Sequence, residues 1–483
     1  MLFNSYLFIL IFMPICIIGY FGLNCLRQKK LAMIFLLGMS LWFYGYFNPI
    51  YLMLIAGSVA VNYLLYQILY RSDRKRVRKI TVISGVMVNI ILLIYFKYTD
   101  FFIGTLNWIT DKDFSLMYLI LPLGISFFTF QQISFLIDTY RKEVTAYHFV
   151  EYACFVTYFP QLIAGPIVTH DELIPQFQDD FRKKINWENF SKGLYIFTIG
   201  LIKKVLIADN FGTVVNIGFD NVHILDSTNA IITMLSYTFQ IYFDFSGYCD
   251  MAIGLGKMMN IDLPLNFNSP YKALTIVDFW KRWHMTLTRF FTKYIYIPLG
   301  SYCGEGRMYF NTFLVFLISG FWHGAGFNFI IWGIGHGLFF ILTKKFNVVF
   351  SSLHPALNWI ITFGFINIMW VFFRASSVYD ALTLLNRIML FNFDDIFADI
   401  TSCFNLDEIV IFLDLFKIRI VYPNIMVLVS FILAFFCVLG MNNSYEKMKL
   451  FKPSVWNCFI VVILVTWSIC SFSSVSTFLY FNF

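Results

Sequence analysis

His323 stands in the run Phe321-Trp-His-Gly324, between a bulky aromatic residue and a glycine. Because glycine has no side chain, a ring nitrogen of His323 could reach a cavity beside it. Imidazole titrates near pH 6.5 when unperturbed, which suits a general base at neutral pH. A lone histidine in an apolar segment is more often a buried structural residue, so this motif alone leaves both interpretations open.

A second histidine closes the motif Asp278-Phe-Trp-Lys-Arg-Trp-His284. Thirty-nine residues separate His284 from His323, enough for a re-entrant segment and a return that bring the two rings together. The alternative is an interfacial helix anchored by its tryptophans and basic residues, with Asp278 and Arg282 paired at i, i+4. Both can hold at once, and His284 is the second candidate for acid-base chemistry.

The third histidine of this region, His336, lies in Trp332-Gly-Ile-Gly-His-Gly337 and raises the question of a three-histidine zinc site. On one continuous helix, a rise of about 1.5 Å per residue puts His323 and His336 ~20 Å apart, too far for one metal ion. Glycines between them could break that helix, but no His, Asp or Glu pair at i, i+4 supports a metal. We therefore predict no metal site and a structural or supporting role for His336.

The composition places these histidines in a membrane protein. Of 483 residues, 59% are hydrophobic and 13% charged, and the mean hydropathy is +0.71, which excludes an ordinary soluble globular protein. The formal net charge of +7 comes from short clusters of Lys and Arg between apolar segments. That distribution is typical of cytoplasmic loops and not of nucleic-acid binding. The nine cysteines include no CxxC pair, so we expect buried thiols and neither disulfides nor metal ligands.

Apolar segments that could cross a bilayer recur along the chain. We expect such helices over 6–22, 31–46, 51–70, 80–96, 116–137, 327–342, 357–373, 425–440 and 455–472. Prolines and charges interrupt 150–204, which predicts short re-entrant or interfacial helices there. A further apolar helix over 231–245 is expected to break near Gly254 and Gly256. Asp244 within that helix and Asp250 just after it are expected to pair with the basic residues Lys257, Lys281 or Arg282.

The charge pattern also predicts a topology. The densest basic run, 71–79, is expected on the cytoplasmic side, which puts the N-terminus outside. An outer loop is expected around 100–113. The acidic stretch 380–414 and the last residues, 473–483, are expected outside as well.

Three further motifs precede the histidine region, and their order along the chain is informative. They read Leu121-Pro-Leu-Gly-Ile-Ser-Phe-Phe-Thr-Phe-Gln131, Tyr158-Phe-Pro-Gln-Leu-Ile-Ala-Gly-Pro166 and Asp244-Phe-Ser-Gly-Tyr248. Together with 278–337 they resemble the membrane-bound O-acyltransferase (MBOAT) family, and within it the bacterial branch typified by the membrane subunit of alginate O-acetylation. The resemblance extends over about residues 1–345.

This resemblance implies an all-α polytopic fold, with about eleven spanning helices and re-entrant segments around a central funnel. It implies one domain over 1–483 with a core at about 116–374. The implied activity is that of an O-acyltransferase, usually an O-acetyltransferase, in the bacterial plasma membrane. Such an enzyme takes an acyl group from a cytosolic thioester, here acetyl-CoA, for the O-acylation of an envelope polysaccharide. No bound cofactor is implied, and a secreted SGNH-type acyltransferase is the expected partner.

The resemblance also assigns roles to residues. His323 occupies the position of the family's catalytic histidine, which implies that it is the base that deprotonates the acceptor hydroxyl. His284 occupies the place of a second polar active-site residue, which orients the reactants or stabilises the charge that develops.

The ending Phe478-Leu-Tyr480-Phe-Asn-Phe483 is aromatic and too short to cross a membrane again. Composition alone favours an aromatic belt at the interface. The ending also resembles a tyrosine-containing C-terminal motif of related envelope acylation systems, which implies that the Tyr480 hydroxyl relays the acyl group to an extracellular transferase.

Two other functions fit parts of the sequence. A polytopic transporter or flippase of a cell-envelope precursor would also use broken helices and ionisable residues at membrane depth. Inverted repeats are expected in that class, and the sequence shows none. A membrane metalloenzyme that uses the three histidines is the second alternative.

Overall fold

The computed structural model describes residues 1–300, 304–405, 423–472 and 478–479. Within these ranges the chain forms helices and no strand, so the expected all-α architecture is confirmed. The helices group into two compact units. Unit 1 consists of Met1–Leu201, Tyr248–Leu265 and Met448–Phe483, and unit 2 consists of Ile202–Gly247 and Asn266–Lys447.

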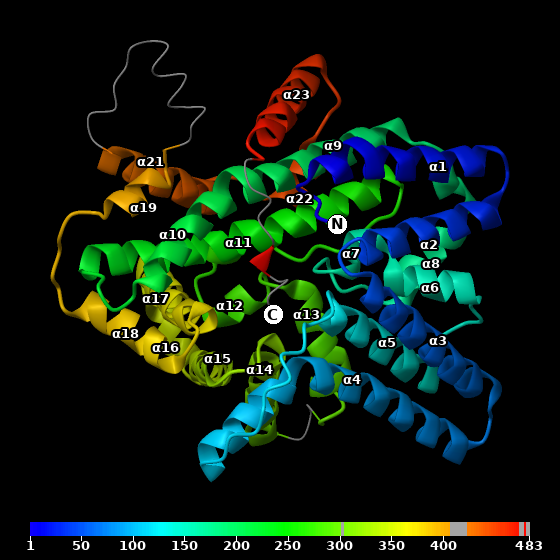
Figure 1. Cartoon of the computed structure of the whole chain (residues 1–483), viewed down its shortest axis with the longest axis horizontal. Helices are drawn as coiled ribbons and strands as arrows, with labels where there is room; N and C mark the ends of the chain where they lie inside the picture. The colour runs from blue at the N-terminus through cyan, green and yellow to red at the C-terminus, as the bar shows by residue number, and fades with distance from the viewer. Residues whose placement is uncertain (301–303, 406–422, 473–477, 480–483) are drawn as a thin grey trace. The chain divides into compact units, whose positions relative to one another are not determined.

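Unit 1 begins with a hairpin-like series of apolar helices. These are η1 (Phe8–Phe12), α1 (Met13–Cys25), α2 (Lys29–Gly45) and α3 (Pro49–Arg71). Neighbouring members pack against each other, α1 on α2 and α2 on α3 (Figure 1). The Asn48 side chain accepts a hydrogen bond from the Ile50 amide, and Pro49 occupies the first turn, which together fix the start of α3. The segments 6–22, 31–46 and 51–70 are therefore helical as expected, and the first and third of them are also long and apolar enough to cross a membrane.

The next two helices differ from the expectation. Helix α4 (Lys75–Thr110) has 36 residues and includes most of the segment 100–113 that was expected to be an outer loop. Helix α5 (Ile125–Tyr140) begins only after Gly124, which has a φ of +69°. A Cβ at this glycine would lie 2.6 Å from the Leu162 carbonyl oxygen. The close approach and the left-handed backbone therefore set the start of α5, and the helix expected over 116–137 was placed too early.

Short helices fill the region 150–204, as predicted. They are α6 (Phe149–Thr157), α7 (Phe159–Leu162), α8 (His170–Gln178), η2 (Asp180–Lys183) and α9 (Trp187–Ile202). Pro160 occupies the first turn of α7, where its missing amide hydrogen costs nothing. Thr169 and Glu172 form a capping box that starts α8. Unit 1 also contains α22 (Ser444–Leu450) in part, and α23 (Val455–Cys470).

Helix α11 (Ser227–Met258) contributes to both units and is continuous over 32 residues. The break expected near Gly254 and Gly256 does not occur. A Cβ at Gly254 would lie 2.6 Å from the carbonyl oxygen of Gly193 on α9. The absence of a side chain thus permits close helix packing and does not end the helix.

Unit 2 begins with η3 (Lys203–Ala208) and α10 (Asp209–Asp220). The ion pair that the structure gives Asp244 is with Lys204, at 2.6 Å, and Lys204 also lies 2.9 Å from Asp209. The expected partners of Asp244 were therefore wrong. Two of them pair elsewhere, Lys257 with Asp262 and Arg282 with Asp278.

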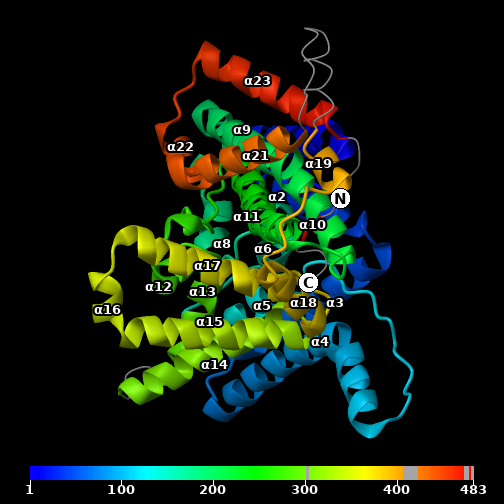
Figure 2. The same cartoon turned by 90° about the vertical axis from the view of Figure 1, so that its left-hand side faces the viewer.

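The remainder of unit 2 holds the histidine motifs and the helices around them. In order these are η4 (Pro270–Lys272), α12 (Ile276–Trp280), α13 (Met285–Phe291), η5 (Thr292–Tyr296), α14 (Glu305–His323), α15 (Phe327–Lys345), α16 (Asn347–Ser352), α17 (Pro355–Arg374), α18 (Val378–Met389), α19 (Ala398–Ser402), α21 (Pro423–Phe435) and η6 (Phe436–Gly440). Helices α14 and α15 lie side by side, and α17 packs on α15 (Figure 2). The expected helices over 327–342 and 357–373 are confirmed.

Five helical segments in the described ranges are long and apolar enough to cross a membrane. They are Phe8–Cys25, Pro49–Arg71, Lys75–Thr110, Phe327–Lys345 and Pro355–Arg374. A bent pair, Asn424–Gly440 and Ser444–Leu450, would make a sixth if it is a single span. This number is lower than the eleven or so that the resemblance implied. Helices such as α5 are buried along most of their length and carry polar side chains, so they lack the apolar surface that a lipid-facing span requires.

Candidate functional site

His323 is the last residue of α14, and the chain leaves the helix at Gly324 in an extended conformation. Its side chain is buried, and three aromatic rings surround the imidazole. The ring-centroid distances are 4.7 Å to Trp322, 5.2 Å to Trp332 and 5.1 Å to Phe373. These rings come from α14, α15 and α17, so three helices together position one imidazole.

His284 is the residue before α13 and has a left-handed backbone conformation, with φ +45° and ψ +51°. The side chain is fully buried. Its Nδ1 lies 3.2 Å from Oδ1 of Asn266. The same oxygen accepts hydrogen bonds from the Thr286 amide at 3.2 Å and the Thr286 hydroxyl at 2.9 Å. The unusual backbone conformation is therefore held by contacts on both sides of the turn.

The Asn266 contacts define the tautomer of His284. The Thr286 amide can only donate, so the Asn266 atom that faces it must be the carbonyl oxygen. That oxygen can only accept, which makes Nδ1 of His284 the protonated nitrogen in the neutral ring. The lone pair then lies on Nε2. In this state His284 can accept a hydrogen bond from a hydroxyl group through Nε2, and it can donate one there only after protonation.

Both histidines contact the same indole ring. Trp322 lies 6.4 Å from His284 and 4.7 Å from His323, measured between ring centroids. Phe245 of α11 also packs edge-on against His284, with a centroid distance of 4.8 Å. The structure therefore brings the two sequence-predicted histidines into one buried aromatic cluster, although α13, η5 and α14 follow one another between them along the chain.

The third histidine, His336, is also part of this cluster. The chain turns back between α14 and α15, so His323 and His336 do not lie on one continuous helix, and the separation of ~20 Å expected for one does not apply. Trp332 contacts both rings, at 5.2 Å from His323 and 4.7 Å from His336. Nδ1 of His336 accepts a hydrogen bond from the Trp280 indole at 3.3 Å. In the described ranges, no group of three or more His, Cys, Asp or Glu side chains could hold a metal ion.

Two glycines allow the close approach of α14 and α15 that makes this cluster. A Cβ at Gly320 would lie 2.4 Å from the Phe329 carbonyl oxygen, and one at Gly333 would lie 2.6 Å from the Phe316 carbonyl oxygen. These distances are shorter than any real Cβ contact. Small residues at a helix crossing permit backbones to approach closely in membrane proteins. Gly320 is one turn before His323, so the crossing directly positions that histidine.

Sequence reasoning missed Asn266 and the role of these glycines. Asn266 lies 18 residues before His284 in a loop, and no periodic pattern connects the two positions. Gly333 was interpreted only as a possible helix breaker, and Gly320 was not considered. The signal that could have revealed them is the small residue on each of two adjacent apolar helices, a pattern typical of helix crossings in membranes.

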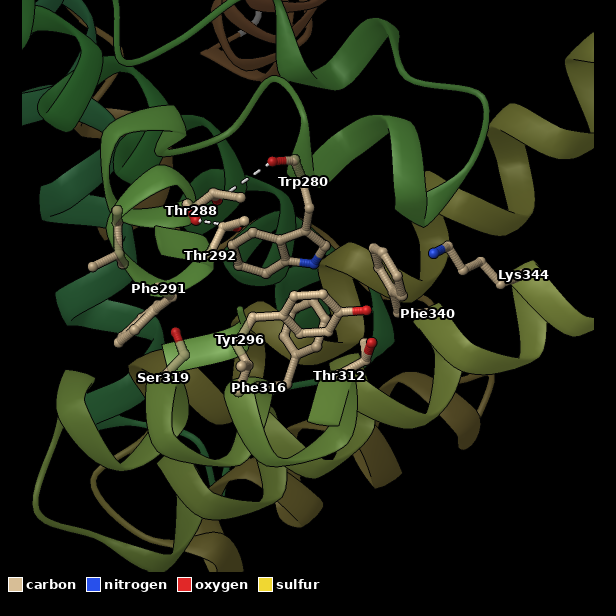
Figure 3. A pocket seen from close by; sticks show the side chains of 12 residues that line it. Trp280, Thr288, Phe291, Thr292, Tyr296, Thr312, Phe316, Ser319, Phe340 and Lys344 are labelled. Carbon is tan, nitrogen blue, oxygen red and sulfur yellow. Dashed lines mark hydrogen bonds between the residues drawn. The ribbon is translucent and has the colours of Figure 1, made fainter. Parts of the chain in front are cut away.

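A hollow of about 240 Å³ lies beside the histidine cluster (Figure 3). Aromatic side chains form much of its wall, and Lys344 lies at one end, near Phe340 (Figure 3). Several wall residues touch the histidine cluster directly, and one of them, Phe316, stacks on His336 with ring centroids 6.3 Å apart. Trp280 donates its hydrogen bond to His336, and Phe291 contacts Trp322 at 6.4 Å between centroids.

Tyr480 lies outside the described residues, so the structure does not place it. Phe478, two residues earlier, packs edge-on against Tyr248 within unit 1, with ring centroids 4.9 Å apart. The role of Tyr480 therefore stays a prediction from the sequence.

Comparison with known proteins identifies a family whose model matches the chain, and several relatives. A model of the membrane-bound O-acyltransferase family matches residues 9–380. A peptidoglycan O-acetyltransferase of Helicobacter pylori is 41% identical over 522 aligned positions, which cover 100% of this chain and 98% of that protein. A probable alginate O-acetylase of Pseudomonas aeruginosa is 38% identical over 403 positions, covering 81% of this chain and 75% of the relative. A teichoic acid D-alanyltransferase of Bacillus subtilis is 28% identical over 264 positions, covering 50% and 66%.

Proposed function

The chain belongs to the membrane-bound O-acyltransferase family, and on that premise we propose that it is an O-acetyltransferase that acts on a bacterial cell-envelope polysaccharide. It is a multi-pass protein of the bacterial cell membrane and an acyltransferase. The relatives named for peptidoglycan and alginate O-acetylation support acetyl as the transferred group and a polysaccharide as the final acceptor.

One observation carries the proposed chemistry: two buried histidines share one indole ring in an apolar cluster. We propose that His323 takes the proton from the acceptor hydroxyl while the oxygen attacks the carbonyl carbon of the thioester. The bond between carbon and sulfur then breaks, and the leaving thiolate takes the proton back from His323. A base held in this way typically contributes about 10² to 10⁴-fold to the rate.

His284 is proposed to orient the acceptor. Its Nδ1 hydrogen points to Asn266, so its Nε2 lone pair suits a hydrogen bond from the acceptor hydroxyl. Stabilisation of the developing oxyanion by His284 would require the protonated ring. The sequence suggested two roles for His284, orientation of the reactants and stabilisation of the developing charge. The neutral tautomer favours the first of these.

The donor is proposed to be acetyl-CoA, supplied from the cytoplasm as a substrate. Neither histidine needs a metal ion or a bound cofactor for this chemistry. The polysaccharide is proposed to receive the acetyl group through a secreted SGNH-type transferase, with Tyr480 as the residue that relays it. Residues 1–483 are proposed to form one membrane domain with its core at about 116–374.

The test uses the purified full chain in liposomes with acetyl-CoA that carries label in both the acetyl group and the coenzyme. An acyltransferase separates the two labels: free coenzyme A stays on the side of addition, and labelled acetyl appears on an acceptor on the other side. A transporter would move a solute without cleaving the thioester. The proposed function would be wrong if free coenzyme A did not accumulate above its level in a protein-free control.

A further inference from the structure

The hollow beside the histidine cluster adjoins a second hollow of about 350 Å³. Trp280, Thr288 and Thr292 line both, so the two share one wall. The first hollow lies between α13, η5, α14 and α15 (Figure 3). The second lies along the other side of α13 and η5. Together they form one continuous surface, which is apolar in the first hollow and basic in the second.

The surface that lines the first hollow is mostly apolar, although several of its wall residues carry polar atoms. Thr292 donates its hydroxyl hydrogen to the Thr288 carbonyl oxygen at 2.7 Å, and Thr312 donates to that of Met308 at 2.8 Å. The Trp280 indole hydrogen goes to His336. These donors are satisfied within the protein, so the wall suits a hydrocarbon chain better than a chain of amides.

The second hollow is basic. Lys281, Arg289 and Lys293 line it, and no Asp or Glu among the described residues lines either hollow. Lys281 and Arg289 are exposed. A fourth cationic group, Lys344, borders the first hollow at one end. The ligand that complements these two hollows has an anionic group directly attached to an apolar chain.

We propose that the two hollows form a binding site for an anionic phospholipid, with one acyl chain in the aromatic hollow and the phosphate among Lys281, Arg289 and Lys293. The chain is a membrane protein, so anionic phospholipid headgroups are available to an exposed basic surface of this kind. Each Lys or Arg near an anionic lipid surface contributes about 1 kcal/mol to binding, and basic pockets between helices bind such headgroups.

The bound acyl chain would support the histidine cluster. It would lie against Trp280, which holds His336, and against Phe291, which contacts Trp322. The proposal concerns binding and stands whether or not the proposed acyl transfer is correct.

The test measures lipid binding to the full chain in detergent by native mass spectrometry. The probes are phosphatidylglycerol and, for comparison, zwitterionic phosphatidylcholine with the same acyl chains. Wild type is expected to bind one phosphatidylglycerol molecule at least tenfold more tightly than phosphatidylcholine. The triple variant Lys281→Gln, Arg289→Gln, Lys293→Gln is expected to bind phosphatidylglycerol about 10- to 100-fold more weakly, because three charges are lost.

A matched control removes the same charge from another basic cluster. The variant Lys75→Gln, Arg76→Gln, Lys79→Gln changes three exposed cations at the start of α4 and should bind phosphatidylglycerol as wild type does. Val315→Phe fills the apolar hollow without a change in charge and should weaken phosphatidylglycerol binding at least tenfold.

Three results would overturn the proposal: equal binding of the two lipids by wild type, unchanged phosphatidylglycerol binding by the Lys281, Arg289 and Lys293 variant, or unchanged binding by Val315→Phe. Acetyl-CoA binding is measured in parallel. If the triple variant loses acetyl-CoA and keeps phosphatidylglycerol, the basic residues hold the phosphates of the thioester donor and the lipid proposal is wrong.

Discussion

The crossing of α14 and α15 can be tested by adding one methyl group. In Gly333→Ala the new Cβ would lie 2.6 Å from the Phe316 carbonyl oxygen and 3.3 Å from the Gly320 Cα. An ordinary van der Waals contact of a Cβ lies at 3.4–4 Å, so the shorter distance would have to grow by roughly 0.8 to 1.4 Å. Both obstacles are backbone atoms of α14, so no side-chain rotation can relieve the clash and the helices must separate.

The expected cost follows from that separation. Forcing a methyl group into a close-packed position costs about 1 to 3 kcal/mol of stability. A shift approaching 1 Å at catalytic groups can reduce the rate by up to ~10²-fold. We therefore expect Gly333→Ala to lower O-acetylation of the envelope polymer by about 10- to 100-fold. The assay is base-releasable acetate on the isolated polymer, divided by the amount of the protein in the membrane.

The same helix offers a control two residues later. A Cβ at Gly335 would lie 2.5 Å from Sδ of Met369, the flexible part of a side chain that can rotate away. Gly335→Ala changes helix propensity as much as Gly333→Ala does, by about 1 kcal/mol. It should retain nearly wild-type acetylation. If the two variants behaved alike, or if Gly333→Ala acetylated normally, the close crossing would not be what positions the histidines.

Three further predictions concern residues elsewhere in the chain. Asn266→Ala removes the acceptor of three hydrogen bonds and should lower acetylation ~10-fold or more by freeing the His284 ring, with a loss of about 1 to 3 kcal/mol in unfolding free energy; full acetylation at a normal melting temperature would contradict it. A cysteine at Ser72 should react with a membrane-impermeant reagent only from the cytoplasm, and one at Asn392 only from outside, because of the basic and acidic clusters around them; labelling of Asn392 from the cytoplasm alone would invert the C-terminal half. Tyr480→Phe keeps the ring but removes the hydroxyl. If Tyr480 relays the acyl group, polymer acetylation should be lost at a normal protein level. Wild-type acetylation would mean that Tyr480 is only part of an aromatic belt at the membrane interface.

The elements that depend on local chemistry could be predicted from the sequence. Apolar runs bounded by caps and prolines indicated α3, α15 and α17, and the broken region 150–204 is a series of short helices as expected. The ion pair between Asp278 and Arg282 also follows from helical spacing and is present at 2.9 Å.

Interactions between distant segments could not be predicted in the same way. The partner of Asp244 is Lys204, 40 residues earlier, because two helices meet there. Asn266 supports His284 from a loop that has no periodic relation to it. Glycine is ambiguous in a sequence: Gly124 marks a left-handed turn, whereas Gly254 and Gly333 lie inside helices at close contacts. Only the fold distinguishes these uses.

The central claim is that His323 is the base of an acyl transfer reaction, and its direct test is polymer acetylation in cells that produce His323→Ala. The substitution removes the imidazole from the end of α14 and should leave expression and membrane insertion near normal. His284→Ala serves as the comparison, with a severe but less complete loss. The account predicts that base-releasable acetate in the His323→Ala strain falls to the level of a strain without the protein, and acetylation above half of the wild-type level at equal protein would contradict it.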